Sequence, residues 1–246
     1  MAFYLRYILW GAVAATIWAS RRRSSRVSAW LPHLIINSLA LLLPEIYGLI
    51  RRRFQLAERL SPERQPSAAA LRLTFEQVAA DNPYYVAYPA PVALGYILSH
   101  PKVNIYQGKL GRLHFLGFGL DAIPHSLTAL ALSTLVYDTI EALESRVRPG
   151  MLIYAPLRRL AAHKTWVAAS VLALLTLIYE TAEYLVHRSE LKANPDESRV
   201  TIVWGVKDTI FDLLANGLGW ALATWRQTSQ ARQPALPPPV PPRRLH

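Results

Sequence analysis

The chain has 246 residues and no cysteine, so disulfide bonds, thiolate metal ligands and cysteine nucleophiles are all excluded. It also contains no Gly-x-Ser-x-Gly nucleophile elbow, no glycine-rich phosphate loop, no dinucleotide fingerprint and no His-Glu-x-x-His zinc motif. These motifs mark common hydrolases, nucleotide-binding enzymes and zinc proteases. Any activity therefore has to rest on residues outside such signatures.

Acidic residues are scarce as well, with 16 against 27 Lys and Arg, which leaves a formal net charge of +11. The arginines stand beside long apolar segments, as at Arg21–Arg23 and Arg51–Arg53. Basic residues in such places set membrane topology and contact anionic lipid headgroups. We therefore predict the lipid bilayer and its anionic headgroups as partners, and no binding of nucleic acid.

Apolar residues make up 52% of the chain and gather in blocks. A helix needs about 20 residues to cross a bilayer. Three blocks are long and apolar enough to span: Phe3–Ala19, Trp30–Ile50 and Trp166–Val186. Two more are long enough but carry charges: Pro124–Leu143 and Val200–Trp225. We predict an all-α fold, a polytopic transmembrane helical bundle of about five spans with one broken or re-entrant helix.

The charges around the first block predict its orientation. It carries one early charge, Arg6, and is followed by Arg21–Arg23 and Arg26. This polarity is the reverse of a cleavable signal peptide and indicates a retained anchor, with the N-terminus outside and the C-terminus inside. The predicted location is the bacterial inner membrane, as a multi-pass protein. Arg51–Arg53 then falls outside, in a loop of about 60 residues, a length largely exempt from the positive-inside rule.

The pattern divides the chain into four parts: two N-terminal transmembrane helices (1–50), a polar interfacial loop (51–109), a C-terminal helical membrane domain (110–226) and a proline-rich basic tail (227–246). Within the loop, Ser67–Ala80 has the period of a short amphipathic helix. Tyrosines and prolines from Tyr84 to Tyr96 follow no period, which predicts an irregular segment at the membrane surface. The tail is predicted to be extended polyproline or disordered.

The C-terminal domain begins with a broken element. Residues 110–123 are rich in glycine and too short to span a bilayer. Pro124 would interrupt a continuous helix but suits the first turn of a new one. We predict a short or re-entrant helix, followed by a spanning helix from Pro124 to Glu144. Irregular backbone at membrane depth has to be covered by protein or to line a polar cavity.

Polar residues recur inside the last apolar block, in the stretch KDTIFDLLANGLGW (Lys207–Trp220). Three of them stand four residues apart and lie along one ridge of a helix: Asp208, Asp212 and Asn216. Small residues form a stripe beside this ridge, which lets a neighbouring helix approach closely: Ala215, Gly219 and Ala223. The ridge is therefore expected to face the bundle.

The preceding block supplies more charges at the same depth. The turn between the last two blocks centres near residues 194 and 195, so Glu180 lies level with Asp208 in an antiparallel pair. A charge at the bilayer centre costs about 2.5–3.5 kcal/mol, so these groups are expected to face one another. The candidate polar cluster comprises His114, Asp121, His125, Glu180, Glu183, His187, Lys207, Asp208, Asp212 and Asn216.

Three interpretations of this cluster are open. A divalent metal could be bound, because carboxylates and histidines suit Zn, Mn, Fe or Mg, although the spacing matches no known metal motif. The ligand set would be Glu180, Glu183, His187, Asp208 and Asp212. A proton or ion relay uses the same residue types. A satisfied polar network that holds helices together is the third, and Lys207 favours it as a built-in counter-charge. Histidines in a membrane bundle also ligate chlorophyll or haem.

Short motifs in this region resemble a known family. They are His114-Phe115 with Gly117, the pair Glu180 and Glu183, and Asp208-Thr209-x-x-Asp212-Leu213 before Asn216 and Gly219. Together they resemble the YjdF-like bacterial inner-membrane proteins, which are similar in turn to the VanZ-like proteins. The resemblance covers roughly residues 110–225 and implies a compact helical membrane domain, in a family with no settled activity. The chain departs from it at Gly205-Val206-Lys207, where a further acidic residue is expected.

The predicted function is therefore an integral membrane protein that is a structural or assembly component, part of a membrane protein complex and built around the buried polar cluster. Two alternatives use the same residues. One is a metal-assisted membrane enzyme acting on a lipid or phospho-substrate, and the other is a proton-coupled transporter.

Overall fold

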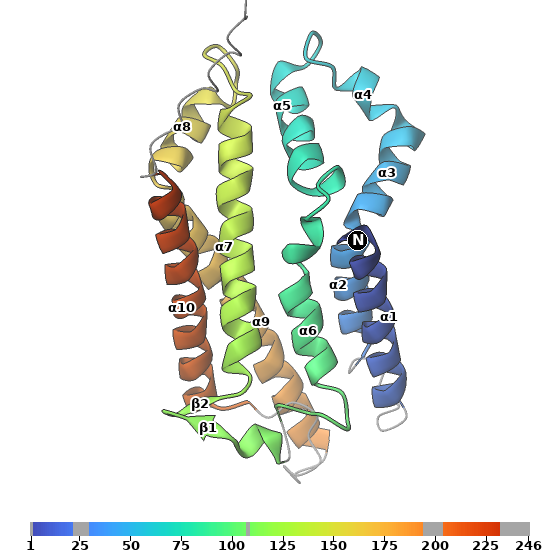
Figure 1. Ribbon diagram of the computed structural model, residues 1–246, viewed down its shortest axis with the longest axis vertical. Helices are drawn as coiled ribbons and strands as arrows, with labels where there is room; N and C mark the ends of the chain where they lie inside the picture. The colour runs from blue at the N-terminus through green and yellow to red at the C-terminus, as the bar shows by residue number, and fades with distance from the viewer. Residues whose placement is uncertain (1, 22–29, 107–108, 194–203, 232–246) are drawn as a thin grey trace, which may run out of the picture.

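The computed structural model describes residues 2–21, 30–106, 109–193 and 204–231 (Figure 1). The described secondary structure is almost entirely helical, which confirms the all-α class. The α-helices are α1 (Ala2–Arg21), α2 (Leu31–Leu41), α3 (Leu43–Phe54), α4 (Leu56–Arg59), α5 (Pro66–Phe75), α6 (Ala90–Leu98), α7 (Ala122–Glu144), α8 (Tyr154–Ala162), α9 (Lys164–Ala193) and α10 (Val206–Ala231). The shorter elements are the π-helix η2 (Glu76–Ala80), the 3-10 helices η3 (Tyr85–Ala87) and η4 (Leu110–Arg112), and the strands β1 (His114–Phe115) and β2 (Phe118–Gly119).

The long helices run along the molecule in alternating directions (Figure 1). In that view α1 descends, α2 with α3 ascends, and α5 with α6 descends again; α7 then ascends, α9 descends and α10 ascends. An apolar core that includes Val13, Leu41 and Ala93 joins α1, α2 and α6. A second core around Tyr137 and Ala223 joins α7, α9 and α10. The fold thus has an N-terminal and a C-terminal group of helices, which meet where α6 packs on α7.

Membrane-crossing character is concentrated in few of these helices. Among the described residues, α9 is long and apolar enough to cross a bilayer, and α2 with α3 is a second candidate if the bent pair counts as one span. The helices α7 and α10 contain the charged residues noted in the sequence, which lower their mean hydropathy. Spanning segments are therefore supported for one or two elements, and the bundle of about five spans stays a prediction.

The predicted second span, Trp30–Ile50, is not one straight helix. Its two pieces, α2 and α3, meet at Leu42 with a bend of 67°. The helical hydrogen bonds of α2 end with Leu42 N–H donating to Ser38 O, and those of α3 begin with Ile46 N–H donating to Leu42 O. Pro44 explains the break, because it has no N–H to extend the ladder of α2 and suits the first turn of α3.

The predicted interfacial loop is largely helical, which corrects the interpretation of 51–109. The amphipathic helix expected over Ser67–Ala80 is present as α5 continued by η2. The irregular segment expected from Tyr84 to Tyr96 is wrong, because it contains η3 and most of α6. The sequence of α6 is almost wholly apolar, and its Ala93 is fully buried in the N-terminal core. Tyr84 and Tyr85 stand at the start of η3, and Pro89 and Pro91 stand at the start of α6.

The predicted short or re-entrant helix over 110–123 is also wrong. This stretch forms η4 and then the β1–β2 hairpin, in which Phe115 pairs with Phe118. The hairpin turns at Leu116 and Gly117, both with positive φ. A Cβ on Gly117 would lie 2.7 Å from the Phe211 ring, so the turn packs directly on the start of α10. The following helix, expected from Pro124 to Glu144, is confirmed as α7.

The ends of the C-terminal helices match the sequence less closely. The last helix, α10, extends to Ala231, so residues 227–231 are helical although they were assigned to the tail. The basic stretch between α7 and α9 contains the helix α8. The rest of the proline-rich tail and the turn at Asn194-Pro195-Asp196 lie outside the described residues.

Candidate functional site

Five carboxylates gather at the end of the C-terminal group where α7 and α10 begin and α9 ends, next to the hairpin (Figure 1). Each interacts electrostatically with others of the set, so they occupy one region of the fold. We call this set the acid cluster; its members are Asp121, Glu180, Glu183, Asp208 and Asp212. The predicted convergence of these residues from three segments is therefore present in the structure.

Glu180 is the most informative member of the acid cluster. It is 8% exposed, and its Oε2 accepts a 2.7 Å hydrogen bond from Thr209 Oγ1 on α10. Within the described part of the chain, its buried Oε1 has no hydrogen-bond partner. Burial of an unpaired carboxylate oxygen carries a desolvation penalty, so this atom favours a ligand that donates a proton or a positive charge. The bond to Thr209 lies at the depth that equal distances from the turn predict.

Asp212 lies one turn further along α10 and is 7% exposed. Its Oδ1 is 3.4 Å from His125 Nε2 on α7, and this contact is an ion pair only when the imidazole is protonated. His114 in β1 contributes a weaker electrostatic interaction with Asp208. Among the described residues, no Lys or Arg forms an ion pair with a member of the acid cluster.

Lys207 does not act as the predicted counter-charge. Its Nζ lies 6.0 Å from the centroid of the Phe211 ring, which faces the hairpin, and the residue is exposed. Within the described ranges it forms no ion pair with any carboxylate. The α10 geometry explains this: the first turn of the helix directs Lys207 outward over Phe211 while Asp208 and Asp212 lie further round the helix. The acid cluster is therefore less neutralised than the sequence indicated.

The predicted metal-ligand set is not assembled around one point. Across the described residues, no three His, Asp or Glu side chains are placed to hold a metal ion together. His187 is half-buried on α9, one turn after Glu183. The metal interpretation consequently receives no geometric support.

The remaining predicted residue, Asn216, belongs to the packing between helices. Its Nδ2 donates to Thr176 Oγ1 on α9 at 3.2 Å, in a buried site. The small-residue stripe beside it contacts α7: Ser126 Oγ donates to Ala215 O at 2.9 Å. A Cβ on Gly219 would overlap the Ser126 carbonyl oxygen and lie 2.8 Å from Ala129 Cβ. The close approach predicted for the stripe is therefore confirmed, and its partner is α7.

Three contributors were missed by sequence reasoning. Thr209 and Thr176 pair with acid-cluster and ridge residues, and threonines inside apolar helices were a usable signal for this. Tyr106, in the loop before η4, lies against Gly95 O at 3.3 Å. Burial raises the pKa of the Tyr106 hydroxyl well above its usual range, and the charge of Asp121 adds to the rise. Its proximity to the acid cluster depends on loop geometry, which no local sequence pattern indicates.

Two carboxylates in the N-terminal group of helices have arginine partners, and one of them, Glu76, is buried. Glu45 pairs with Arg6 at 2.9 Å. Glu76, which is 6% exposed, accepts 2.9 Å bonds from Arg72 Nη1 and Tyr47 OH, and Arg51 lies at 3.4 Å. None of these pairs was predicted. Glu45 and Arg6, and likewise Glu76 and Arg51, come from elements whose relative placement the sequence pattern did not specify. Arg72 and Glu76 are an i,i+4 pair within the predicted helix over Ser67–Ala80, so this spacing was a usable signal.

Comparison with protein-family models, with curated proteins and with solved structures found no match for this chain. The YjdF-like resemblance stays a prediction carried by the motifs that suggested it.

Proposed function

We propose that this chain is an integral membrane protein that binds and passes a proton, or another monovalent cation, through the acid cluster of its C-terminal helices. The proposal takes up the proton-coupled transporter considered from the sequence. It is supported most directly by Glu180, whose buried Oε1 accepts no hydrogen bond from the described residues. In a region of low dielectric constant, several carboxylates repel one another strongly, so a cation lowers the free energy by binding there.

The geometry of the acid cluster also fits a relay. Glu180 and Glu183 are on α9, Asp208 and Asp212 on α10, and Asp121 at the start of α7. Carboxylates from α9, from α10 and from the start of α7 offer successive sites for a proton, and His125 beside Asp212 adds a further site on α7. A divalent metal is not part of the proposal, since no three ligands converge among the described residues.

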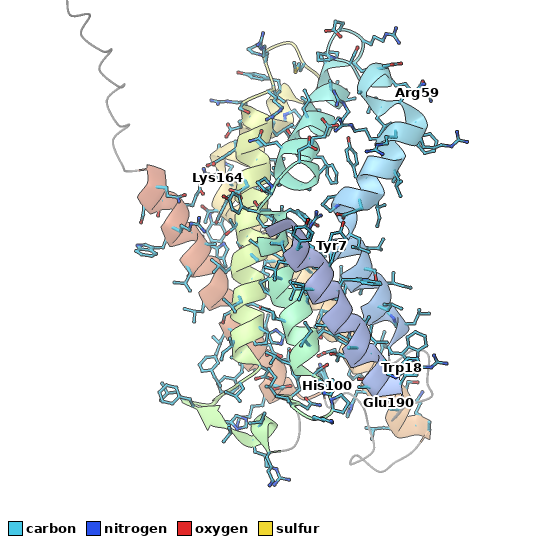
Figure 2. All side chains as sticks on the ribbon, turned by 45° about the vertical axis from the view of Figure 1, so that its right-hand side comes forward. Tyr7, Trp18, Arg59, His100, Lys164 and Glu190 are labelled. Atoms are coloured by element: carbon cyan, nitrogen blue, oxygen red, sulfur yellow. The ribbon has the colours of Figure 1, made fainter. Side chains whose placement is uncertain are left out.

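The membrane arrangement that we propose rests on the arginines of α3 and α8, whereas Arg21 at the end of α1 lies toward the other end. The ascending runs of α2 with α3 and of α7 bring Arg51–Arg53 and Arg158–Arg159 to one end of the molecule, the upper end in Figure 1, which we call the basic end. Figure 2 labels Arg59 and Lys164 toward this end, and His100 and Glu190 at the other. We propose that the basic end is cytoplasmic, following the positive-inside rule. The start of α1 and the end of α10 then face the same side, in contrast to the N-outside orientation predicted from five spans.

Flux measurement in liposomes tests the proposal. The purified protein is reconstituted with a pH-sensitive dye inside, and proton entry is followed after a pH jump. We expect Glu180→Gln to abolish the flux, because the amide cannot bind and release a proton. Glu144→Gln is the matched control: this residue is on α7, 3.8 Å from Arg158 and outside the acid cluster. Equal flux in wild type and Glu180→Gln would contradict the proposal.

A structural or assembly role is the second candidate, supported by the exposed apolar face of α9. Leu174, Leu177 and Ile178 are each more than half exposed on this helix, which lipid or a second protein can cover. A larger complex after purification in mild detergent supports the assembly role, and a monodisperse monomer argues against it. The bacterial inner-membrane location remains a prediction.

A further inference from the structure

A polar pocket of about 350 Å³ lies between η2 and α7, well away from the acid cluster. Its polar lining residues are Gln77, Asn82, Tyr88, Asp138, Glu141 and Ser145. Asp138 follows His125 by 13 residues on α7, which separates the pocket from the acid cluster by roughly 20 Å at 1.5 Å per residue. The volume falls within the range of small-molecule sites. We call it the upper pocket, since it lies toward the basic end of the helices.

The π-helix η2 shapes one wall of the upper pocket. Its widened turn is closed by the i→i+5 bond from Asp81 N–H to Glu76 O at 2.8 Å. Glu76 is held on the far side by Arg72 and Tyr47, so the next residue, Gln77, faces α7 and the pocket. Single π-turns are rare and frequently border functional sites. This wall is therefore anchored rather than loosely packed.

Two carboxylate oxygens in the upper pocket accept no hydrogen bond from the described residues. Tyr88 OH donates to Asp138 Oδ2, Asn82 Nδ2 to Val78 O, and Ser145 Oγ to Ala142 O. On Glu141, Lys164 and Gln227 both donate to Oε1. Among the described residues, Asp138 Oδ1 and Glu141 Oε2 accept no hydrogen bond. Because these carboxylates are i and i+3 on α7, they point the same way and suit a donor with several N–H groups.

Positive charge lies next to this pair of carboxylates. A smaller cavity of about 50 Å³ shares Asp138 and is lined by Arg226 and Gln230 on α10. Within the described ranges, Arg226 forms no ion pair, so its guanidinium is available to an anionic group. The two adjoining cavities thus present carboxylate acceptors on one side and a guanidinium donor on the other.

We propose that the upper pocket binds a zwitterion with a primary ammonium group, whose N–H groups donate to Asp138 and Glu141 and whose phosphate or carboxylate pairs with Arg226. This chemistry has two sources: the headgroup of phosphatidylethanolamine, which reaches the pocket from the bilayer, and a free small zwitterion such as phosphoethanolamine. The site does not depend on proton transfer at the acid cluster.

The experiment uses the full chain in phosphatidylcholine nanodiscs and calorimetric titration with two probes, phosphoethanolamine and phosphocholine. We expect phosphoethanolamine to bind at least about tenfold more tightly, because a trimethylammonium group has no N–H to donate to the carboxylates. A second arm places phosphatidylethanolamine in the nanodiscs and measures its retention on the protein by mass spectrometry. Binding in the first arm assigns a soluble ligand, and retention in the second assigns the lipid headgroup. Binding in neither arm overturns the proposal.

Variants identify the contacts. Asp138→Asn and Glu141→Gln should each weaken the binding that is found by about tenfold or more, and Glu144→Gln should leave it unchanged. If Asp138→Asn fails to fold, Arg226→Met gives an independent test: it should weaken phosphoethanolamine binding while leaving binding of ethanolamine, which has no anionic group, unchanged. Equal affinities for phosphoethanolamine and phosphocholine, or unaltered binding in Asp138→Asn, Glu141→Gln and Arg226→Met alike, would overturn the assignment.

Discussion

Each of the two helix groups contains a buried glutamate, and the two glutamates have different partners. Glu76 in the N-terminal half and Glu180 in the C-terminal half are 6% and 8% exposed, so their burial is nearly the same. Glu76 is surrounded by Arg72, Arg51 and Tyr47, whereas Glu180 receives one hydroxyl bond from Thr209. Because the two glutamates are equally buried but have different partners, burial alone does not determine the role of such a residue. A buried carboxylate held by guanidinium groups stabilises the fold, and one held by a single hydroxyl is available to a cation.

The largest effect is expected from removal of the Arg72–Glu76 ion pair. Arg72→Met removes the two 2.9 Å bonds to the buried Glu76 and leaves it with Tyr47 and the longer Arg51 contact. Loss of one partner of a buried ion pair costs about 3–5 kcal/mol. The free energy of unfolding, from denaturant titration in detergent, measures it. Arg53→Met, at an exposed position on the same side of the molecule, is the control and should change little. If Arg72→Met lowers the free energy of unfolding no more than the control does, the Arg72–Glu76 ion pair contributes nothing to stability.

The same comparison predicts opposite signs for two amide substitutions. Glu76→Gln should lower the free energy of unfolding by about 1.5–3 kcal/mol, because charge-assisted bonds to Arg72 are lost. Glu180→Gln should leave it unchanged or raise it, because a charge without a basic partner among the described residues is removed from a buried site. Parallel denaturant titrations measure both variants. Destabilisation of equal size in the two variants would show that Glu76 and Glu180 do not differ in this way.

Helix packing around the acid cluster gives a third prediction. Gly219→Ala puts a methyl group into the Ser126 carbonyl oxygen at the α7–α10 crossing, and overpacking of this kind costs about 1–3 kcal/mol. Gly217→Ala, two residues earlier on α10, is the matched control, since a Cβ there meets no described atom within 4 Å. It should stabilise the helix by up to about 1 kcal/mol. Thermal unfolding followed by circular dichroism separates the two, and equal melting temperatures would show that α7 and α10 are not in close contact.

The smallest effect is expected at Thr209. Thr209→Val keeps the shape of the side chain and removes the 2.7 Å bond to Glu180 Oε2, which costs about 1 kcal/mol. Thr228→Val on the same helix, whose hydroxyl bonds only to its own helix backbone, is the control. Comparison of the two denaturation midpoints measures the bond. A midpoint for Thr209→Val equal to that of the control would indicate that Glu180 obtains no stabilisation from α10.

Sequence reasoning succeeded where a local period or a single residue decides the structure. The helix after Pro124, the close approach at Gly219 and the depth of Glu180 opposite the first turn of α10 all follow from spacing along the chain. It failed where tertiary packing decides, as in α6, whose short apolar sequence has no distinctive period and becomes helical against α1 and α7. Lys207 shows the same limit, since its direction depends on Phe211 and the hairpin rather than on its position in the ridge.

The central claim is that proton binding by the acid cluster requires the Glu180 carboxylate, and infrared difference spectroscopy tests it most directly. Spectra of the purified protein recorded across a pH series contain a carbonyl band that grows as carboxylates take up protons. In the wild type, we predict a component of this band that is absent from Glu180→Gln and retained in Glu144→Gln. A band that is identical in wild type and Glu180→Gln at every pH would contradict the account.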